Sequence, residues 1–134
     1  MYVPDYDEFA RMAERGNLVP VYREIMADLD TPVSAFLKLQ AGGNNYSCLL
    51  ESVTGGENVV RFSYIAVAPP LLMSSTGRHV TMRHNEDVNE FDLPEGRDPL
   101  HVLKDLFASY RHVPLPGWKR FPGGMVGYMG YDLV

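Results

Sequence analysis

Two short runs, Tyr46-Ser-Cys-Leu-Leu-Glu-Ser-Val53 and Arg61-Phe-Ser-Tyr-Ile65, decide the fold of this chain. Both are rich in apolar, aromatic or β-branched residues, and a glycine-containing turn at 54–57 lies between them. Runs of this kind on either side of a turn predict neighbouring strands of an antiparallel sheet. The first run ends in Glu51 and Ser52, so a carboxylate and a hydroxyl follow a buried apolar stretch. That placement favours a small pocket with apolar walls and a polar rim.

The sheet extends outward from these runs. Strand patterns cover 46–53, 59–67 and 80–84, with turn-forming residues at 54–57 and 74–77, and together they predict an antiparallel meander within residues 46–92. The C-terminal stretch 121–134 is glycine-spaced, apolar and aromatic, which is typical of a further, buried strand. Because this apolar stretch ends without a polar tail, we expect the chain to be part of something longer.

Three helices are predicted from capping residues. Asp5 with Glu8 begins the first, which ends at Gly16. Thr31 followed by Pro32 begins the second, since a threonine cap and a proline at the first helical position favour a helix start. Asp98-Pro99 begins the third, whose apolar stripe indicates core packing. The expected fold is α+β, with helices packed on an antiparallel sheet as part of a larger two-sheet sandwich.

Composition narrows the classes of function. The chain has 134 residues, 46% hydrophobic and 22% charged, which fits one modest domain. Its net charge of −5 argues against a nucleic-acid partner, because no basic stripe is available for phosphates. The apolar runs are shorter than the ~20 residues of a membrane span, so no membrane association and a cytoplasmic location are expected. The single cysteine, Cys48, is expected to be a buried structural thiol.

No catalytic arrangement stands out among the residues. His79 and His84 are five positions apart on a predicted strand and so point to opposite faces, which excludes a metal pair. The Gly55-Gly56 pair is not followed by the Lys-Ser/Thr of a phosphate loop. Trp118, beside Pro116-Gly117, is interpreted as a loop anchor. No catalytic residue and no metal ligand are predicted in this chain.

Six strings, in order along the chain, resemble the N-terminal region of anthranilate synthase component I. The resemblance runs from about residue 18 to the end, and six strings in the same order are far more specific than any one of them. The strings are Pro20–Glu24, Thr31–Leu39, Leu49–Ser52, Arg61–Tyr64, Asp98–Leu100 and Phe121–Asp132.

The resemblance implies a role in tryptophan biosynthesis. The complete family enzyme is a lyase that converts chorismate to anthranilate, with Mg2+ and with ammonia from a glutamine amidotransferase subunit, component II. Its chorismate and Mg2+ sites lie in a C-terminal region that is absent here. Residues 1–134 are therefore expected to form a single N-terminal regulatory domain that holds no cofactor and is not catalytic alone. The expected protein partners are the missing C-terminal region and component II, and a second copy of the chain stays open as a further partner.

By the same resemblance, the Leu-Leu-Glu-Ser motif is the centre of the feedback site for L-tryptophan. Glu51 is the carboxylate suited to the ligand ammonium, and Ser52 can donate or accept a hydrogen bond. Arg61 is the candidate partner of the ligand carboxylate. Leu49 and Leu50 alternate across the sheet, so only one of them can face the indole. In the competing structural interpretation, Glu51 and Ser52 merely begin a turn and Arg61 pairs with Glu51 across a hairpin.

Two other functions remain open at this point. The sister enzyme aminodeoxychorismate synthase component I of folate synthesis has the same architecture and a similar motif, although Pro20–Glu24 favours the anthranilate branch. In the other alternative the chain is a non-enzymatic interaction module, whose C-terminal strand adds to a sheet of a partner. A rise in melting temperature with free tryptophan distinguishes these cases.

Overall fold

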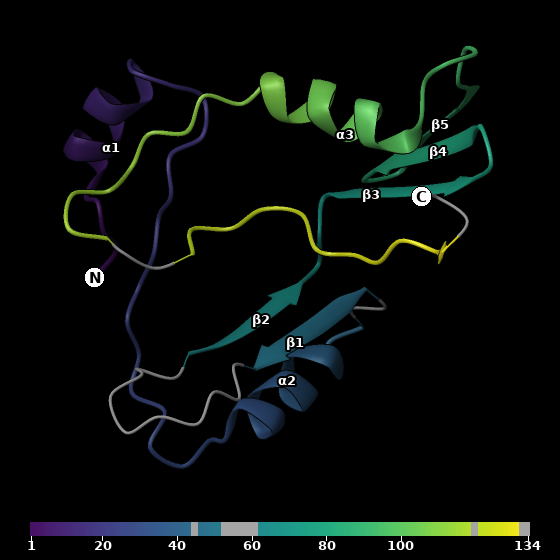
Figure 1. Ribbon diagram of the computed structural model, residues 1–134. Helices are drawn as coiled ribbons and strands as arrows, with labels where there is room; N and C mark the ends of the chain where they lie inside the picture. The colour runs from purple at the N-terminus through teal and green to yellow at the C-terminus, as the bar shows by residue number, and fades with distance from the viewer. Residues whose placement is uncertain (44–45, 52–61, 119–120, 132–134) are drawn as a thin grey trace, which may run out of the picture. The chain divides into compact units, whose positions relative to one another are not determined.

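The structure is a computed structural model that describes residues 1–43, 46–51, 62–118 and 121–131 (Figure 1). The chain divides into two compact units, one with residues 1–25, 75–80 and 90–134 and the other with residues 26–74 and 81–89. In chain order the elements are α1 (Tyr6–Ala13), α2 (Pro32–Gln40), β1 (Ser47–Glu51), β2 (Ser63–Val67), β3 (Leu71–Thr76), β4 (His79–His84), β5 (Asp87–Asp92) and α3 (Pro99–Ala108). This arrangement confirms the α+β class.

The predicted caps start the helices where the sequence placed them. Asp5 accepts a 2.8 Å hydrogen bond from the amide of Glu8 at the start of α1. At α2 the Thr31 hydroxyl accepts from the Ser34 amide, and the Ser34 hydroxyl accepts from the Thr31 amide in return. Asp98 accepts from the amide of His101 in the same way at α3. These bonds satisfy backbone donors that have no partner within the helix.

Strands β1 and β2 form a two-stranded antiparallel sheet, as predicted. Leu49 lies opposite Ile65 and Leu50 opposite Tyr64 in the ladder. Helix α2 packs on both strands, and the side-chain Nε2 of Gln40, its last residue, donates to the Ser47 hydroxyl over 3.4 Å. Since side chains alternate along a strand, Ser47, Leu49 and Glu51 share one face, and the contact from Gln40 identifies it as the α2 side.

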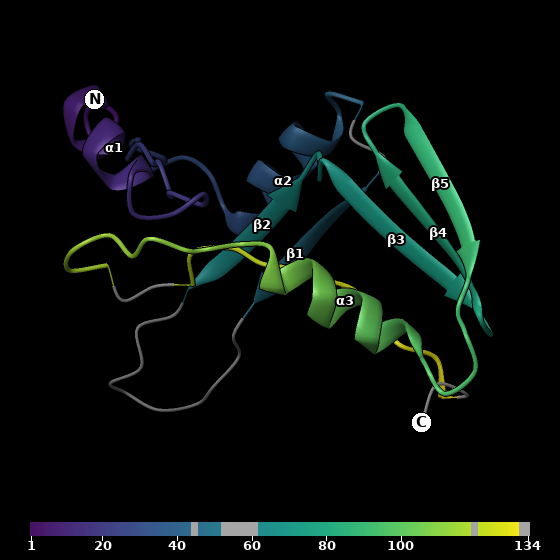
Figure 2. The same ribbon diagram turned by 90° about the horizontal axis from the view of Figure 1, so that it is seen from above.

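The second sheet has the strand order β3-β4-β5 (Figure 2). It corrects the prediction of one continuous meander in two ways. Strand β3 occupies Leu71–Thr76, so its last three residues lie in the stretch 74–77 that the sequence predicts as a turn. The break between β2 and β3 falls at Pro69-Pro70, which lack the amide hydrogens that a ladder requires.

A small core holds the first unit together. Met12 of α1 packs with Val113 and Leu115, each less than a tenth exposed, and Val19, Tyr22 and Trp118 pack against this cluster. The stretch 18–22 makes two isolated bridges: Leu18 pairs with His112, and Tyr22 with Val3. The Leu18–His112 bridge ties the N-terminal part of the chain to the segment that follows α3.

The predicted C-terminal strand is wrong. The described residues 121–131 contain no β-strand, and the side chains of Tyr128 and Tyr131 are more than nine-tenths exposed. Without a neighbouring strand to accept its hydrogen bonds, a glycine-spaced segment has little to hold it extended, because glycine adds no side-chain packing.

Within the described part of the chain, no helix combines the length and the apolar character needed to cross a membrane.

Candidate functional site

The end of β1 carries three of the five predicted site residues. Leu49, Leu50 and Glu51 are consecutive in the strand and face Ile65, Tyr64 and Ser63 of β2. Alternation along the strand places Leu49 and Glu51 on the α2 face and Leu50 on the opposite face. The three residues are neighbours along β1, but they lie on two different faces of the sheet.

Glu51 makes a cross-strand hydrogen bond. The Ser63 hydroxyl donates to Glu51 Oε1 over 3.2 Å, and both side chains are exposed. A carboxylate offers about four acceptor positions, and among the described residues the Ser63 hydroxyl occupies one of them. With respect to these residues, Glu51 is held at one oxygen and has acceptor positions for the N–H groups of an ammonium ion.

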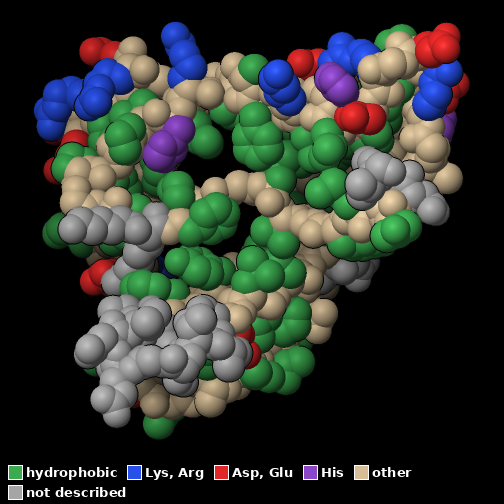
Figure 3. All heavy atoms as spheres, viewed as in Figure 1, with side chains coloured by type: hydrophobic (Ala, Val, Ile, Leu, Met, Phe, Trp, Pro, Cys, Tyr) green, Lys and Arg blue, Asp and Glu red, His purple; other side chains and the backbone are tan. Residues whose placement is uncertain are grey.

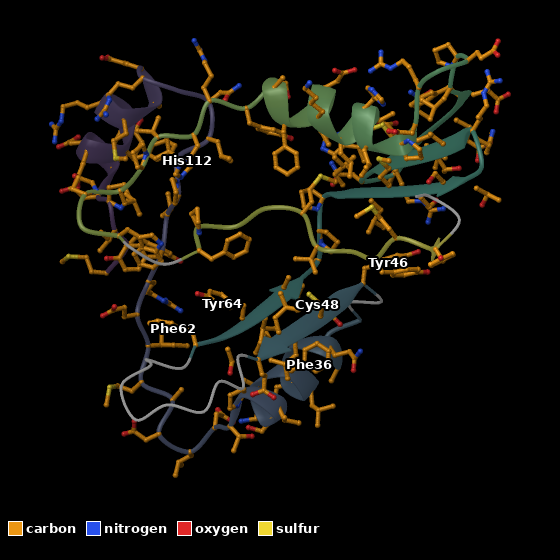
Figure 4. The ribbon with its side chains drawn as sticks, viewed as in Figure 1. Phe36, Tyr46, Cys48, Phe62, Tyr64 and His112 are labelled. Carbon is orange, nitrogen blue, oxygen red and sulfur yellow. The ribbon has the colours of Figure 1, made fainter. Side chains whose placement is uncertain are left out.

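The two leucines differ in their surroundings. Leu49 is half-buried on the α2 face, opposite Ile65, whereas Leu50 is 44% exposed on the other face. In Figure 4, Tyr64 and Phe36 of α2 lie on opposite sides of the two-stranded sheet. Of the two leucines, only Leu49 shares a surface with Glu51.

The face opposite α2 is apolar and aromatic. Tyr64 of β2 and Phe62, the residue just before this strand, have ring centroids 6.4 Å apart and planes tilted by 42°. Leu50 and the half-buried Cys48 lie on the same face, so Cys48 is less enclosed than predicted. Figure 3 shows hydrophobic side chains over the β1–β2 pair in this view.

The other two predicted site residues, Ser52 and Arg61, lie outside the described residues. The predicted role of Arg61 toward a ligand carboxylate and the competing Glu51–Arg61 pair both involve these positions, so each stays a prediction.

Ser63 is the residue near the site that sequence reasoning missed. It was quoted in the Arg61–Ile65 run but given no role. The register of the two strands would have identified it. If Leu49 pairs with Ile65 in an antiparallel ladder, the residue two positions after Leu49 pairs with the residue two positions before Ile65, so Glu51 lies opposite Ser63.

The arrangement at the end of β1 has the chemistry of a binding site. It offers a carboxylate anchored by a hydroxyl beside a half-buried aliphatic side chain, which fits an ammonium group attached to an apolar body. Among the residues that the structure describes, no three His, Cys, Asp or Glu side chains are grouped as a metal site would require.

Curated relatives match nearly the whole chain. It is 42% identical over 129 residues to an anthranilate synthase component 1 from Pseudomonas putida, an alignment that covers 96% of this chain and 25% of the relative. The proteins of the same name from Synechocystis sp. and Acetivibrio thermocellus are 36% and 38% identical, and each alignment covers 100% of this chain and 26% of the relative. The chain thus spans about a quarter of the length of the curated relatives it matches. No family model matches the chain, and no solved structure matches it.

Proposed function

Because the chain belongs to the anthranilate synthase component 1 family, we propose that it is the N-terminal, regulatory part of an enzyme that makes anthranilate from chorismate and ammonia. In this proposal the chain binds L-tryptophan as a feedback inhibitor and does not catalyse the reaction by itself. The names of the similar relatives favour the anthranilate branch over the aminodeoxychorismate branch.

The proposed effector role rests on the exposure and orientation of the Glu51 carboxylate. Its carboxylate is exposed at the end of β1 and is oriented by the Ser63 hydroxyl. A bound amino acid needs an anionic acceptor for its ammonium group, and a fixed carboxylate loses less conformational freedom on binding than a mobile one.

The faces of β1 suggest how the ligand would lie. With the ammonium at Glu51, Leu49 is the leucine on the same face, so we assign the indole contact to Leu49 and a packing role to Leu50. Ser52 and Arg61 complete the proposal: the Ser52 hydroxyl bonds to the polar end of the ligand, and Arg61 receives its carboxylate.

The remaining parts of the proposal concern the complete enzyme. Its C-terminal region would bind chorismate and Mg2+, and a glutamine amidotransferase subunit would supply ammonia. These assignments rest on the family resemblance, and the present residues hold none of those sites in the proposal. Tryptophan at the β1 end would then act by lowering the affinity for chorismate elsewhere in the enzyme.

A thermal shift experiment tests the effector role. L-Tryptophan should raise the melting temperature of the chain, because a ligand that binds only the folded state adds about 2.7 kcal/mol of stability at a hundredfold excess over its Kd. L-Alanine, which has the same ammonium and carboxylate but no indole, is the control and should have little effect. An unchanged melting temperature at millimolar tryptophan, or an equal rise with alanine, would refute the proposal.

A further inference from the structure

A pocket lies in the first unit, and none of its lining residues belongs to β1 or β2. It has a volume of about 240 Å³ and is bounded by α1, the N-terminal residues and the turn before Trp118. Pockets for drug-sized ligands usually have at least about 300 Å³, so this one suits a smaller molecule. Its lining residues are Val3, Glu8, Tyr22, Leu115, Pro116, Gly117 and Trp118.

A tight turn positions one wall of the pocket. The Trp118 amide donates to the Leu115 carbonyl over 3.1 Å, and Gly117 has a φ of +76°. A proline followed by a residue with positive φ is the pattern of a type II turn, in which glycine is preferred at the second position. Pro116-Gly117 therefore fixes Trp118 where it packs against the Met12 cluster, which confirms its predicted role as a loop anchor.

Two aromatic rings form a corner of the pocket. The centroids of Tyr22 and Trp118 are 4.5 Å apart, and the ring planes are tilted by 45°. Tyr22 is held in place by two backbone hydrogen bonds with Val3, of 2.8 and 2.9 Å. Aromatic faces attract cations, tryptophan most strongly, so this corner is electrostatically suited to a positive group.

Among the described residues that line the pocket, Glu8 is the one with a formal charge. It is half-buried in the first turn of α1, and no lysine, arginine or histidine in the described ranges forms an ion pair with it. Among the described residues, this half-buried carboxylate therefore has no counter-charge within ion-pair distance. The remaining lining side chains, from Val3, Leu115 and Pro116, are apolar.

From this combination we propose that the pocket binds a small organic cation, namely a primary alkylammonium. The ammonium group bonds to the Glu8 carboxylate and lies against Tyr22 and Trp118, and the alkyl chain contacts Val3 and Leu115. The proposal is independent of the tryptophan site, since none of its residues belongs to β1 or β2. The net charge of −5 adds a long-range attraction for such ligands.

Trp118 provides a direct test, because it is the single tryptophan of the chain. n-Butylammonium, titrated at constant ionic strength, should change the Trp118 fluorescence with saturation. n-Butanol, which has the same alkyl chain without the charge, should not. A linear change with no saturation, or an equal response to butanol, would overturn the proposal.

Matched variants locate the site. Glu8→Gln should weaken butylammonium binding by about tenfold or more, because a charge-assisted hydrogen bond is lost. Glu14→Gln removes the same charge from the end of α1 without touching the pocket and should bind as the unaltered chain does. Equal affinities of the Glu8→Gln and Glu14→Gln variants would contradict the assignment.

A second pair of variants tests the aromatic wall and guards against a folding defect. Tyr22→Phe keeps the ring and should retain binding, whereas Tyr22→Leu should weaken it several-fold. Both are compared at equal circular dichroism signal, and binding is also followed by the chemical shift of the Trp118 indole proton. Equal binding by the Phe and Leu variants would exclude a role for the ring.

Discussion

Asn17 and Arg111 are 94 positions apart in the sequence, yet the Arg111 amide donates a 2.6 Å hydrogen bond to Asn17 Oδ1. The other side-chain atom of Asn17, Nδ2, donates to the carbonyl of Ser109 over 2.8 Å. One side chain thereby satisfies two backbone groups just after α3, where carbonyls lack helical partners. This contact joins the turn after α1 to the segment after α3.

Asn17→Ala should therefore destabilise the chain. Two hydrogen bonds at about 0.5–1.5 kcal/mol each give an expected loss of about 1–3 kcal/mol, measured by urea denaturation. Asn17→Asp keeps the acceptor for the Arg111 amide but removes the donor to Ser109, so its loss should be intermediate. A free energy of unfolding unchanged in Asn17→Ala would show that water replaces both bonds at no cost.

The neighbouring Gly16 has no room for a side chain. A Cβ atom there would lie 2.2 Å from the Arg111 carbonyl oxygen and 2.6 Å from a methyl group of Val113. Gly16→Ala should cost at least about 1–3 kcal/mol of stability, as overpacking does. Gly127→Ala, where no atom lies within 4 Å of the new Cβ, is the control and should stay within about 0.5 kcal/mol. Equal stabilities of the two variants would mean that the close packing at Gly16 is not present in solution.

Acid should weaken the start of α3. Hydrogen bonds from the His101 side chain and then from its backbone amide hold the pKa of the Asp98 carboxyl below its ordinary value. A carboxyl with a lowered folded-state pKa stabilises the fold above its unfolded pKa of about 3.9, and this contribution disappears as pH falls through the lower folded pKa.

Asp98→Asn removes the carboxylate charge but keeps the helix cap, because asparagine caps helices about as well as aspartate. The variant should lose less stability than the unaltered chain when pH falls from 5 to about 2, as measured by thermal unfolding at each pH. Parallel stability curves for the two proteins would rule out a contribution from Asp98 titration.

In the intact family enzyme, Glu51→Gln should relieve inhibition by L-tryptophan. Loss of a charge-assisted hydrogen bond costs roughly 1.5–3 kcal/mol, which is about ten- to a hundredfold in the inhibition constant. Ser52→Ala, which removes a neutral hydroxyl, should have a smaller effect. Turnover of chorismate without tryptophan should change little in both variants, since the proposal assigns the chorismate site to the C-terminal region of the complete enzyme. A loss of turnover as large as the relief of inhibition would instead make these residues structural.

The sequence predicted the helices well because their signals are local. Thr31-Pro32 and Asp98-Pro99 define helix starts through a cap and a fixed proline φ, and neither signal depends on distant residues. The strands were less predictable. Leu71–Thr76 forms β3 although serines suggested a turn, because pairing with β4 outweighs the weak local preference.

Only part of the candidate site could be predicted, because the rest depends on strand pairing rather than on local sequence. The Leu-Leu-Glu run and its alternation followed from the sequence, but the position of Ser63 opposite Glu51 depends on the register between two strands. The pocket beside Trp118 was not foreseen at all. It depends on Val3, Glu8 and Trp118, which only the folded chain brings together.

The most direct test of the effector role is equilibrium dialysis of radiolabelled L-tryptophan against the chain and two charge-matched variants. The account predicts saturable binding at one site per chain, weakened ten- to a hundredfold by Glu51→Gln, on the order of a lost charge-assisted bond, and unchanged by Glu8→Gln. Equal affinities of the unaltered chain and Glu51→Gln, or the absence of saturable binding, would contradict it.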